Sequence, residues 1–212
     1  MNTESVTIRG YQPADLDDLY SICVRTANSG QDATSLYRNP RLAGEIWAAP
    51  YGVLEPDLAF VAEDSAGVGG YVLGALDTEA FGDRLERDWW PALRARYPEP
   101  GPAAAASLPA RDRQALYEIY HPFRASADLT ARFPSHLHID LLPRLQGRGL
   151  GRRMMQTLIA ALRERGSRGV HLFVSRSNVR AVEFYRRLGL TEVAATAEGR
   201  VFALDLGADP RG

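Results

Sequence analysis

One glycine-rich loop limits the folds open to this chain more than any other feature. The segment Gln146–Arg152 has glycines at 147, 149 and 151, shortly after a strand pattern over 137–142 and at the start of an amphipathic pattern over 149–165. Glycine reaches positive φ and lets the backbone approach a ligand closely. The first turn of a helix leaves N–H groups unpaired, and its dipole favours negative charge. Strand, loop and helix in this order predict an α/β fold with a diphosphate-binding loop.

The alternative for this loop is a tight turn with solvated arginines, and the strand before it and the helix after it argue against that. The loop lacks both the G-x-G-x-x-G of dinucleotide-binding folds and the Gly-Lys-Ser/Thr of a P-loop. We expect neighbouring arginines to complement the charge of the phosphates. The predicted binding set is Gln146, Gly147, Arg148, Gly149, Leu150, Gly151, Arg152 and Arg153.

Hydrophobic periodicity predicts strands alternating with helices along the rest of the chain. We expect a mixed sheet covered on both faces, a single domain over 1–207 with a helical insertion over about 78–134, and a disordered tail over 208–212. Expected strands cover 6–9, 58–62, 71–76, 137–142, 170–174, 191–194 and 201–206, and expected helices cover 13–24, 42–48, 81–97, 111–120, 149–165 and 178–188.

Composition narrows the functional classes. The formal net charge of -1 gives no reason to expect a nucleic acid or an anionic membrane as partner. All 25 basic residues are arginine, which excludes a lysine Schiff base. The single cysteine, Cys23, lies on an apolar helix face and is predicted to be core. With no apolar leader and no membrane-length apolar run, we expect a soluble, cytoplasmic protein.

The glycine loop resembles the Gln/Arg-x-x-Gly-x-Gly/Ala motif of the GNAT superfamily of acyl-CoA N-acyltransferases. A second family motif is matched further along by Asn178, Ala181, Phe184-Tyr185 and Leu188-Gly189-Leu190. The resemblance covers nearly the whole chain. It implies the GNAT fold, with a mostly antiparallel sheet of about six to seven strands and the insertion between the third and fourth.

A narrower resemblance is to the carboxy-terminal acetyltransferase-like domain of O-GlcNAcase, and more closely to bacterial stand-alone relatives of that domain. The animal domain lacks the glycine pattern, whereas this chain keeps it, so we expect acetyl-CoA binding here. The segments that carry this resemblance are 18–23, 70–74, 133–135 and 166–169.

The GNAT resemblance also implies roles for individual residues. Backbone groups of Leu141 and Leu142 are expected to hold pantetheine and the thioester carbonyl. Tyr185 takes the position that donates a proton to the departing thiolate, and a phenol with a pKa near ~10 is suited to that role. Asn178 is a helix N-cap residue that also contacts CoA. The implied activity is acetyl-CoA-dependent transfer of an acetyl group to an amine; the alternative is a non-catalytic acetyl-CoA-binding or protein-interaction module.

The general base has two candidates. Asp140 and His138 alternate with apolar residues, so both side chains project from the same face of their strand. We favour Asp140, which also corresponds to an aspartate in the O-GlcNAcase-like domain, and keep His138 as the alternative. The remaining histidines, His121, His136 and His171, have no matching partners, and no metal site is predicted.

The residues of the insertion do not identify the acceptor. Phe81, Leu85, Trp89, Leu93 and Tyr97 recur every four residues, which predicts one buried helix face. An acceptor pocket and a homodimer surface remain the alternatives for its aromatic residues, including Trp90. Acyl length and acceptor identity stay open.

Overall fold

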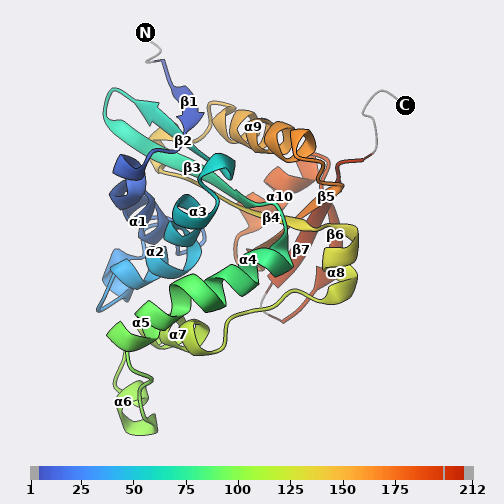
Figure 1. Cartoon of the computed structure of the whole chain (residues 1–212). Coiled ribbons are helices and arrows are strands. Elements are labelled where there is room, and N and C mark those ends of the chain that lie inside the picture. The colour runs from blue at the N-terminus through green and yellow to red at the C-terminus, as the bar shows by residue number, and fades with distance from the viewer. Residues whose placement is uncertain (1–4, 198, 208–212) are drawn as a thin grey trace.

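Seven strands form one mixed sheet in the order β1-β2-β3-β4-β5-β7-β6 (Figure 1). The structure, a computed structural model, describes residues 5–197 and 199–207, so the tail predicted over 208–212 lies outside it. Neighbouring strands run antiparallel except β4 and β5, which are parallel. This confirms the predicted fold class. The strands are β1 (Thr7–Gly10), β2 (Ala59–Asp64), β3 (Gly67–Ala75), β4 (Ser135–Leu141), β5 (Gly169–Ser175), β6 (Thr191–Ala195) and β7 (Gly199–Asp205).

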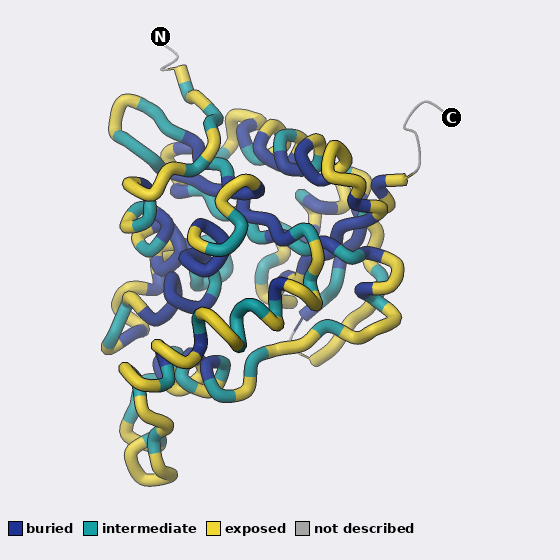
Figure 2. Tube along the Cα trace, in the orientation of Figure 1, coloured by how far each residue is buried: buried dark blue, intermediate teal, exposed yellow. Residues whose placement is uncertain are grey.

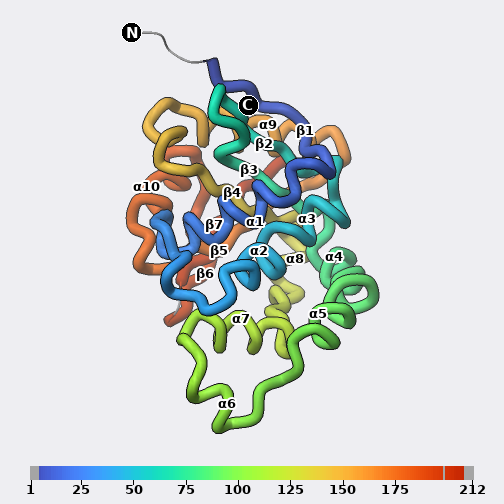
Figure 3. Tube along the Cα trace, turned by 90° about the vertical axis from the view of Figure 1, so that its left-hand side faces the viewer, coloured from blue at the N-terminus to red at the C-terminus, as the bar shows by residue number. Residues whose placement is uncertain are grey.

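Helices cover both faces of this sheet, as Figures 1 and 3 show. One face packs against α9 (Leu150–Glu164) and α10 (Val179–Arg187). The other packs against α1 (Leu16–Val24), α2 (Arg41–Trp47) and α3 (Ala49–Leu54). Each face has its own cluster of buried side chains, because successive residues of a strand point to opposite sides.

The buried face of helix α9 explains why its sequence pattern predicted a helix. Leu150, Met154, Leu158 and Leu162 recur every four residues, and each is at most 2% exposed. The opposite side of the helix faces solvent (Figure 2). Burying side chains of this size contributes roughly 1.5–3 kcal/mol each, so this stripe fixes the helix, and with it the glycine loop, against the sheet.

The segment between β3 and β4 is helical, but it is not the single straight helix expected over 81–97. Its first part is α4 (Thr78–Arg84), a π-helical turn η4 (Leu85–Trp89) and α5 (Trp90–Arg96). The wider turn shifts the helix face by one residue, so Trp90 and Leu93 are buried while Trp89 is only half-buried. Their contacts with the core that includes α1 support the core interpretation of these aromatic residues.

Other differences from the sequence prediction are short helices without long periodic patterns. Helix α3 and a 3₁₀ turn η2 (Thr34–Leu36) were not expected. In the second part of the insertion, α7 (Ala110–Tyr120) was expected, whereas α6 (Pro102–Ala106) and α8 (Ala127–Arg132) were not. Three further short turns are 3₁₀ helices: η1 (Pro13–Asp15), η3 (Pro56–Leu58) and η5 (Pro143–Leu145). Among the described helices, none has the length and apolar character needed to cross a bilayer.

Candidate active site

The central feature of the site is a split between the parallel strands β4 and β5. They pair only at Ser135 with Val170 and at His136 with His171. Beyond that point β4 continues to Leu141 along β3, while β5 continues along β7. A wedge therefore opens in the middle of the sheet.

Backbone groups of β4 face into this wedge. The Leu142 N–H donates to Gly69 O at 2.8 Å, and hydrogen-bonded and non-hydrogen-bonded pairs alternate along an antiparallel ladder. Leu142, Asp140 and His138 therefore turn their backbone groups towards β3, and Ile139 and Leu141 turn theirs towards the split. The expectation for Leu142 is corrected, since its amide is already used. The sequence does not reveal that the backbone of Ile139 faces the split, because strand register is a tertiary property.

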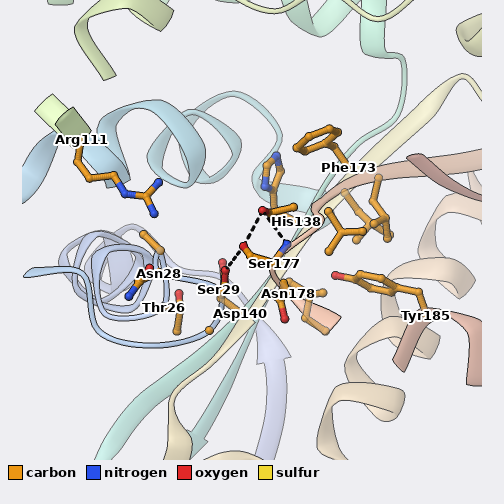
Figure 4. Close-up of a pocket in the computed structure, with 17 residues that line it drawn as sticks. Thr26, Asn28, Ser29, Arg111, His138, Asp140, Phe173, Ser177, Asn178 and Tyr185 are labelled. Atoms are coloured by element: carbon orange, nitrogen blue, oxygen red, sulfur yellow. Dashed lines mark hydrogen bonds between the residues drawn. The ribbon is translucent and has the colours of Figure 1, made fainter. Parts of the chain in front are cut away.

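A cavity of about 250 Å³ lies at the split. Its floor includes His138 and Asp140 of β4 and Phe173 of β5, and Tyr185 of α10 reaches it from the other layer (Figure 4). The structure thus brings together three residues that the sequence analysis proposed for acid–base roles. Phe173 is 53% exposed, an unusual position for a large apolar side chain in the middle of a sheet.

Asp140 is a carboxyl group whose proton affinity is set by its surroundings. Burial raises its pKa to about 6, against the opposing effect of the hydrogen bond from Tyr71. The Tyr71 hydroxyl donates to Asp140 Oδ2 at 2.7 Å. Cys23 lies near this pair and is buried, as predicted, and burial raises the pKa of its thiol. Asp140 can therefore be ionised at neutral pH and still accept a proton.

Tyr185 meets the cavity from the side opposite Asp140. Its side chain is 7% exposed, and its hydroxyl points to the cavity in Figure 4. Burial, with a smaller contribution from the charge of Asp140, raises the pKa of the phenol. The group therefore stays protonated throughout the physiological range and has a proton to donate.

His138 is the weaker candidate for a base. Burial lowers the pKa of its imidazole to about 4, so it is neutral at pH 7 with little affinity for a proton. Its ring packs on that of Tyr51, with centroids 5.2 Å apart. Asp140, which titrates closer to neutrality, is the better base by this comparison.

The three remaining histidines have hydrogen-bonding partners, and for His121 this is Tyr117 O, 3.3 Å from Nδ1. His136 Nε2 lies 2.7 Å from the Tyr51 hydroxyl and its Nδ1 lies 2.8 Å from the Thr78 hydroxyl. His171 Nδ1 lies 2.8 Å from Phe133 O. Burial lowers the pKa of both imidazoles, and these contacts make them structural. His121 stacks on the exposed ring of Tyr117.

The glycine loop has the backbone shape that the sequence predicted. Gly147 has φ +76° and Gly149 has φ +70°, both in the left-handed region that favours glycine. The first α-helical hydrogen bond of α9 runs from Arg153 N–H to Gly149 O, at 3.2 Å. The N–H groups of the first helical turn therefore have no carbonyl acceptor within the helix itself. A Cβ on Gly151 would come within 3.1 Å of Phe184.

Side chains around the loop divide into structural and available groups. Leu150 is buried, so only its backbone can face a ligand. Gln146 Nε2 donates to Leu141 O at 2.7 Å, which ties the loop to the split strand. Asn178 caps α10 through a hydrogen bond from Ala181 N–H and also lines the cavity. Arg148, Arg152 and Arg153 are exposed and make no ion pair within the described residues.

This combination of a split parallel pair, a glycine loop and a following helix defines an acyl-CoA-dependent acetyltransferase fold. The acetyltransferase (GNAT) family model matches residues 45–190, more than half of the chain, and the chain belongs to that family. Acetyl-CoA is the co-substrate of the family. The residues present fit it: free helix-start amides for a diphosphate, and outward backbone groups on β4 for an extended arm.

Individual relatives refine the comparison. The crystal structure of SsHAT is 41% identical, with a TM-score of 0.87 over 95% of this chain and 98% of that chain. Protein O-GlcNAcase of Rattus norvegicus is 29% identical over 188 residues, 89% of this chain and 20% of that protein. The mycothiol acetyltransferase of Salinispora tropica is 34% identical over 125 residues, 57% of this chain and 41% of that protein. The chain thus spans a fifth to two fifths of the length of these two curated relatives, and the predicted resemblance is confirmed.

Proposed function

We propose that the protein transfers an acetyl group from acetyl-CoA to an amine by direct attack on the thioester. One observation carries this proposal: Asp140 and Tyr185, a carboxyl that titrates near pH 6 and a neutral phenol, line one cavity at the split between β4 and β5. An acetyl transfer needs a proton removed from the amine and a proton supplied to the leaving sulfur. These two groups meet both needs.

We assign binding of the co-substrate mainly to backbone groups, with side chains in a smaller role. The amides of Gly147 to Arg152 receive the diphosphate, with Arg148, Arg152 and Arg153 adding charge around it. Ile139 and Leu141 present backbone groups to the pantetheine arm, and an N–H from this pair stabilises the carbonyl oxygen as it gains charge. Acetyl-CoA supplies the activated acyl group.

The proton transfers follow from the positions of the two side chains. Asp140 accepts a proton from the ammonium form of the acceptor, directly or through water, which frees the nitrogen lone pair. The new C–N bond forms as the C–S bond breaks, and Tyr185 donates its proton to the sulfur. The acylated nitrogen then loses its remaining extra proton to solvent, and solvent returns a proton to the Tyr185 phenolate. Tyr71 holds the Asp140 carboxylate in place through its hydroxyl.

The competing function is a non-catalytic acetyl-CoA-binding or protein-interaction module. The test is release of free CoA thiol across a panel of amines, with calorimetric titration of acetyl-CoA in parallel. The enzyme gives binding heat and amine-dependent thiol release that Asp140→Asn reduces. A pure binding module gives the heat alone, and that result would reject catalysis while leaving the binding assignment intact.

A further inference from the structure

A single cation lines the cavity within the described part of the chain. Arg111, in the first turn of α7, extends its guanidinium towards the cavity from the side of the insertion (Figure 4). The residue is half-buried, and no hydrogen bond or ion pair is found for its side chain among the described residues. Most other arginines of the insertion do have such a partner, as Arg84, Arg94 and Arg96 illustrate. Arg111 is thus a positive charge facing the acceptor side with its five donors unused.

The neighbouring residue fixes where Arg111 lies. Asp112 is 3% exposed, and its carboxylate accepts hydrogen bonds from Arg38 N–H at 2.8 Å and Asn39 N–H at 3.0 Å. These bonds join the start of α7 to the segment that leads into α2. Hydrogen bonds from backbone N–H groups to a buried carboxylate are among the stronger ones, so the backbone at Arg111 is held in register with the cavity wall.

Part of the remaining wall is polar and comes from two separate segments of the chain. Asn28 and Ser29 line it from the segment after α1, and Ser177 lines it from the segment after β5. The Ser29 and Ser177 hydroxyls are hydrogen-bonded at 2.8 Å, which links the two segments beside the cavity (Figure 4). At about 30 Å³ per water molecule, the cavity holds roughly eight waters, and the acceptor shares this volume with the acetyl end of the co-substrate, so the acceptor is small.

We propose that the acceptor is a small amine that also carries an anionic group, a carboxylate or a phosphate, which Arg111 binds. The inference rests on the proposed function, because it places the amine at Asp140. Arg111 and Asp140 then give the cavity one pole of each sign, which matches a zwitterionic amine. A guanidinium is suited to either anion, since its fork of donors pairs with two oxygens at once. A polyamine would bring a second positive charge to Arg111.

The test compares matched acceptors that differ only in the acidic group. We would measure kcat/KM for ω-amino acids from glycine to 6-aminohexanoate against their amides, and for O-phosphoethanolamine against ethanolamine. We expect one of the acids to exceed its neutral partner by about ten- to a hundredfold, the range for a hydrogen bond to a charged group. The length of the acid with the highest kcat/KM reports the distance between Arg111 and Asp140. The series with the larger preference for the acid shows whether the anionic group is a carboxylate or a phosphate.

Variants then assign the preference to this side chain. Arg111→Ala is expected to bring the acid-to-neutral ratio close to one, while Arg111→Lys keeps part of it. The matched control is Arg113→Ala on the same helix, where the side chain is exposed and makes only a 3.4 Å hydrogen bond to Ala105 O. Arg113→Ala is expected to keep the full acid-to-neutral ratio of kcat/KM. Unchanged melting temperatures would show that all three variants fold.

Two results would overturn the inference without touching the proposed function: amines acetylated with no preference for the acids, or a preference that Arg111→Ala leaves intact. If no amine is acetylated, the proposed function fails separately. Calorimetric titration of the same acids into CoA-saturated protein then decides the question. Heat that is present in the wild type and absent in Arg111→Ala supports the anion site, and no heat in the wild type refutes it.

Discussion

Replacing Asp140 with asparagine is expected to make the protein more stable and less active at the same time. The amide has nearly the shape of the carboxyl, and its oxygen can still accept the hydrogen bond from Tyr71. It cannot ionise and cannot accept a proton. The substitution therefore removes both the cost of a buried charge and the proposed base.

The size of the stability gain follows from proton linkage. Burial raises the pKa of Asp140 from 3.8 to about 6, and each pKa unit corresponds to ~1.36 kcal/mol. Because the pKa is raised in the folded state, the contribution to stability is fully present below about pH 4 and is lost as the pH rises through 6. The ionised carboxyl therefore costs about 3 kcal/mol at pH 8, of which roughly 1.5 kcal/mol accrues between pH 5 and pH 8.

Urea denaturation of the wild type and Asp140→Asn at pH 5 and pH 8 measures this difference. We expect the variant to gain on the wild type by roughly 1.5 kcal/mol between the two pH values. Asp128→Asn, at an exposed carboxyl of α8, is the control and should show no such change. A stability difference that is the same at both pH values would refute the assignment of a raised pKa to Asp140.

Activity gives the second half of this test. With acetyl-CoA and an accepted amine, kcat/KM of the wild type is expected to fall about tenfold per pH unit below pH 6, as Asp140 becomes protonated. Asp140→Asn is expected to lose about 10²- to 10⁴-fold in turnover. A variant that is stabilised yet fully active would show that Asp140 has a structural role alone.

Three further substitutions test other parts of the site. Tyr185→Phe is expected to lower turnover by about a hundredfold with acetyl-CoA affinity, measured by calorimetry, nearly unchanged; unchanged turnover would remove the proton-donor role. Gly149→Ala, at positive φ, is expected to lower the free energy of unfolding by about 1–2 kcal/mol and to weaken acetyl-CoA binding at least about tenfold. The control is Gly166→Ala, at the other end of the same helix and also at positive φ, which is expected to lose similar stability and no affinity for acetyl-CoA. Equal affinities would argue against the phosphate loop. Tyr51→Phe removes one of the two hydroxyl partners of the half-buried His136 and is expected to cost about 1–2 kcal/mol in urea denaturation; a neutral effect would mean that water replaces the bond.

The parts of the fold that sequence patterns predicted are those encoded by local chemistry. The stripe on α9 repeats every four residues, the glycines allow positive φ, and Asn178 is a good N-cap residue, so each can be read without knowing the tertiary structure. The π-helical turn at 85–89 is different. The four-residue spacing of Phe81 to Tyr97 matches a straight helix equally well, so the pattern does not reveal the extra residue in the turn.

What the sequence did not predict depends on register and on contacts between distant segments. Strand pairing between β4 and β5 ends after His136, but residues 137–141 look like any buried strand. One partner of His136 is Tyr51, 85 residues earlier. Arg111 reaches the cavity only because Asp112 joins α7 to the segment before α2. None of these contacts has a signature in the local residue pattern.

A crystal structure of the protein with acetyl-CoA would test the central claim most directly. We expect the diphosphate to contact the amides between Gly147 and Arg152, and the thioester carbonyl to lie within hydrogen-bonding distance of an N–H of Ile139 or Leu141, between Asp140 and Tyr185. A diphosphate bound elsewhere, or a pantetheine arm that does not enter the split between β4 and β5, would contradict the account.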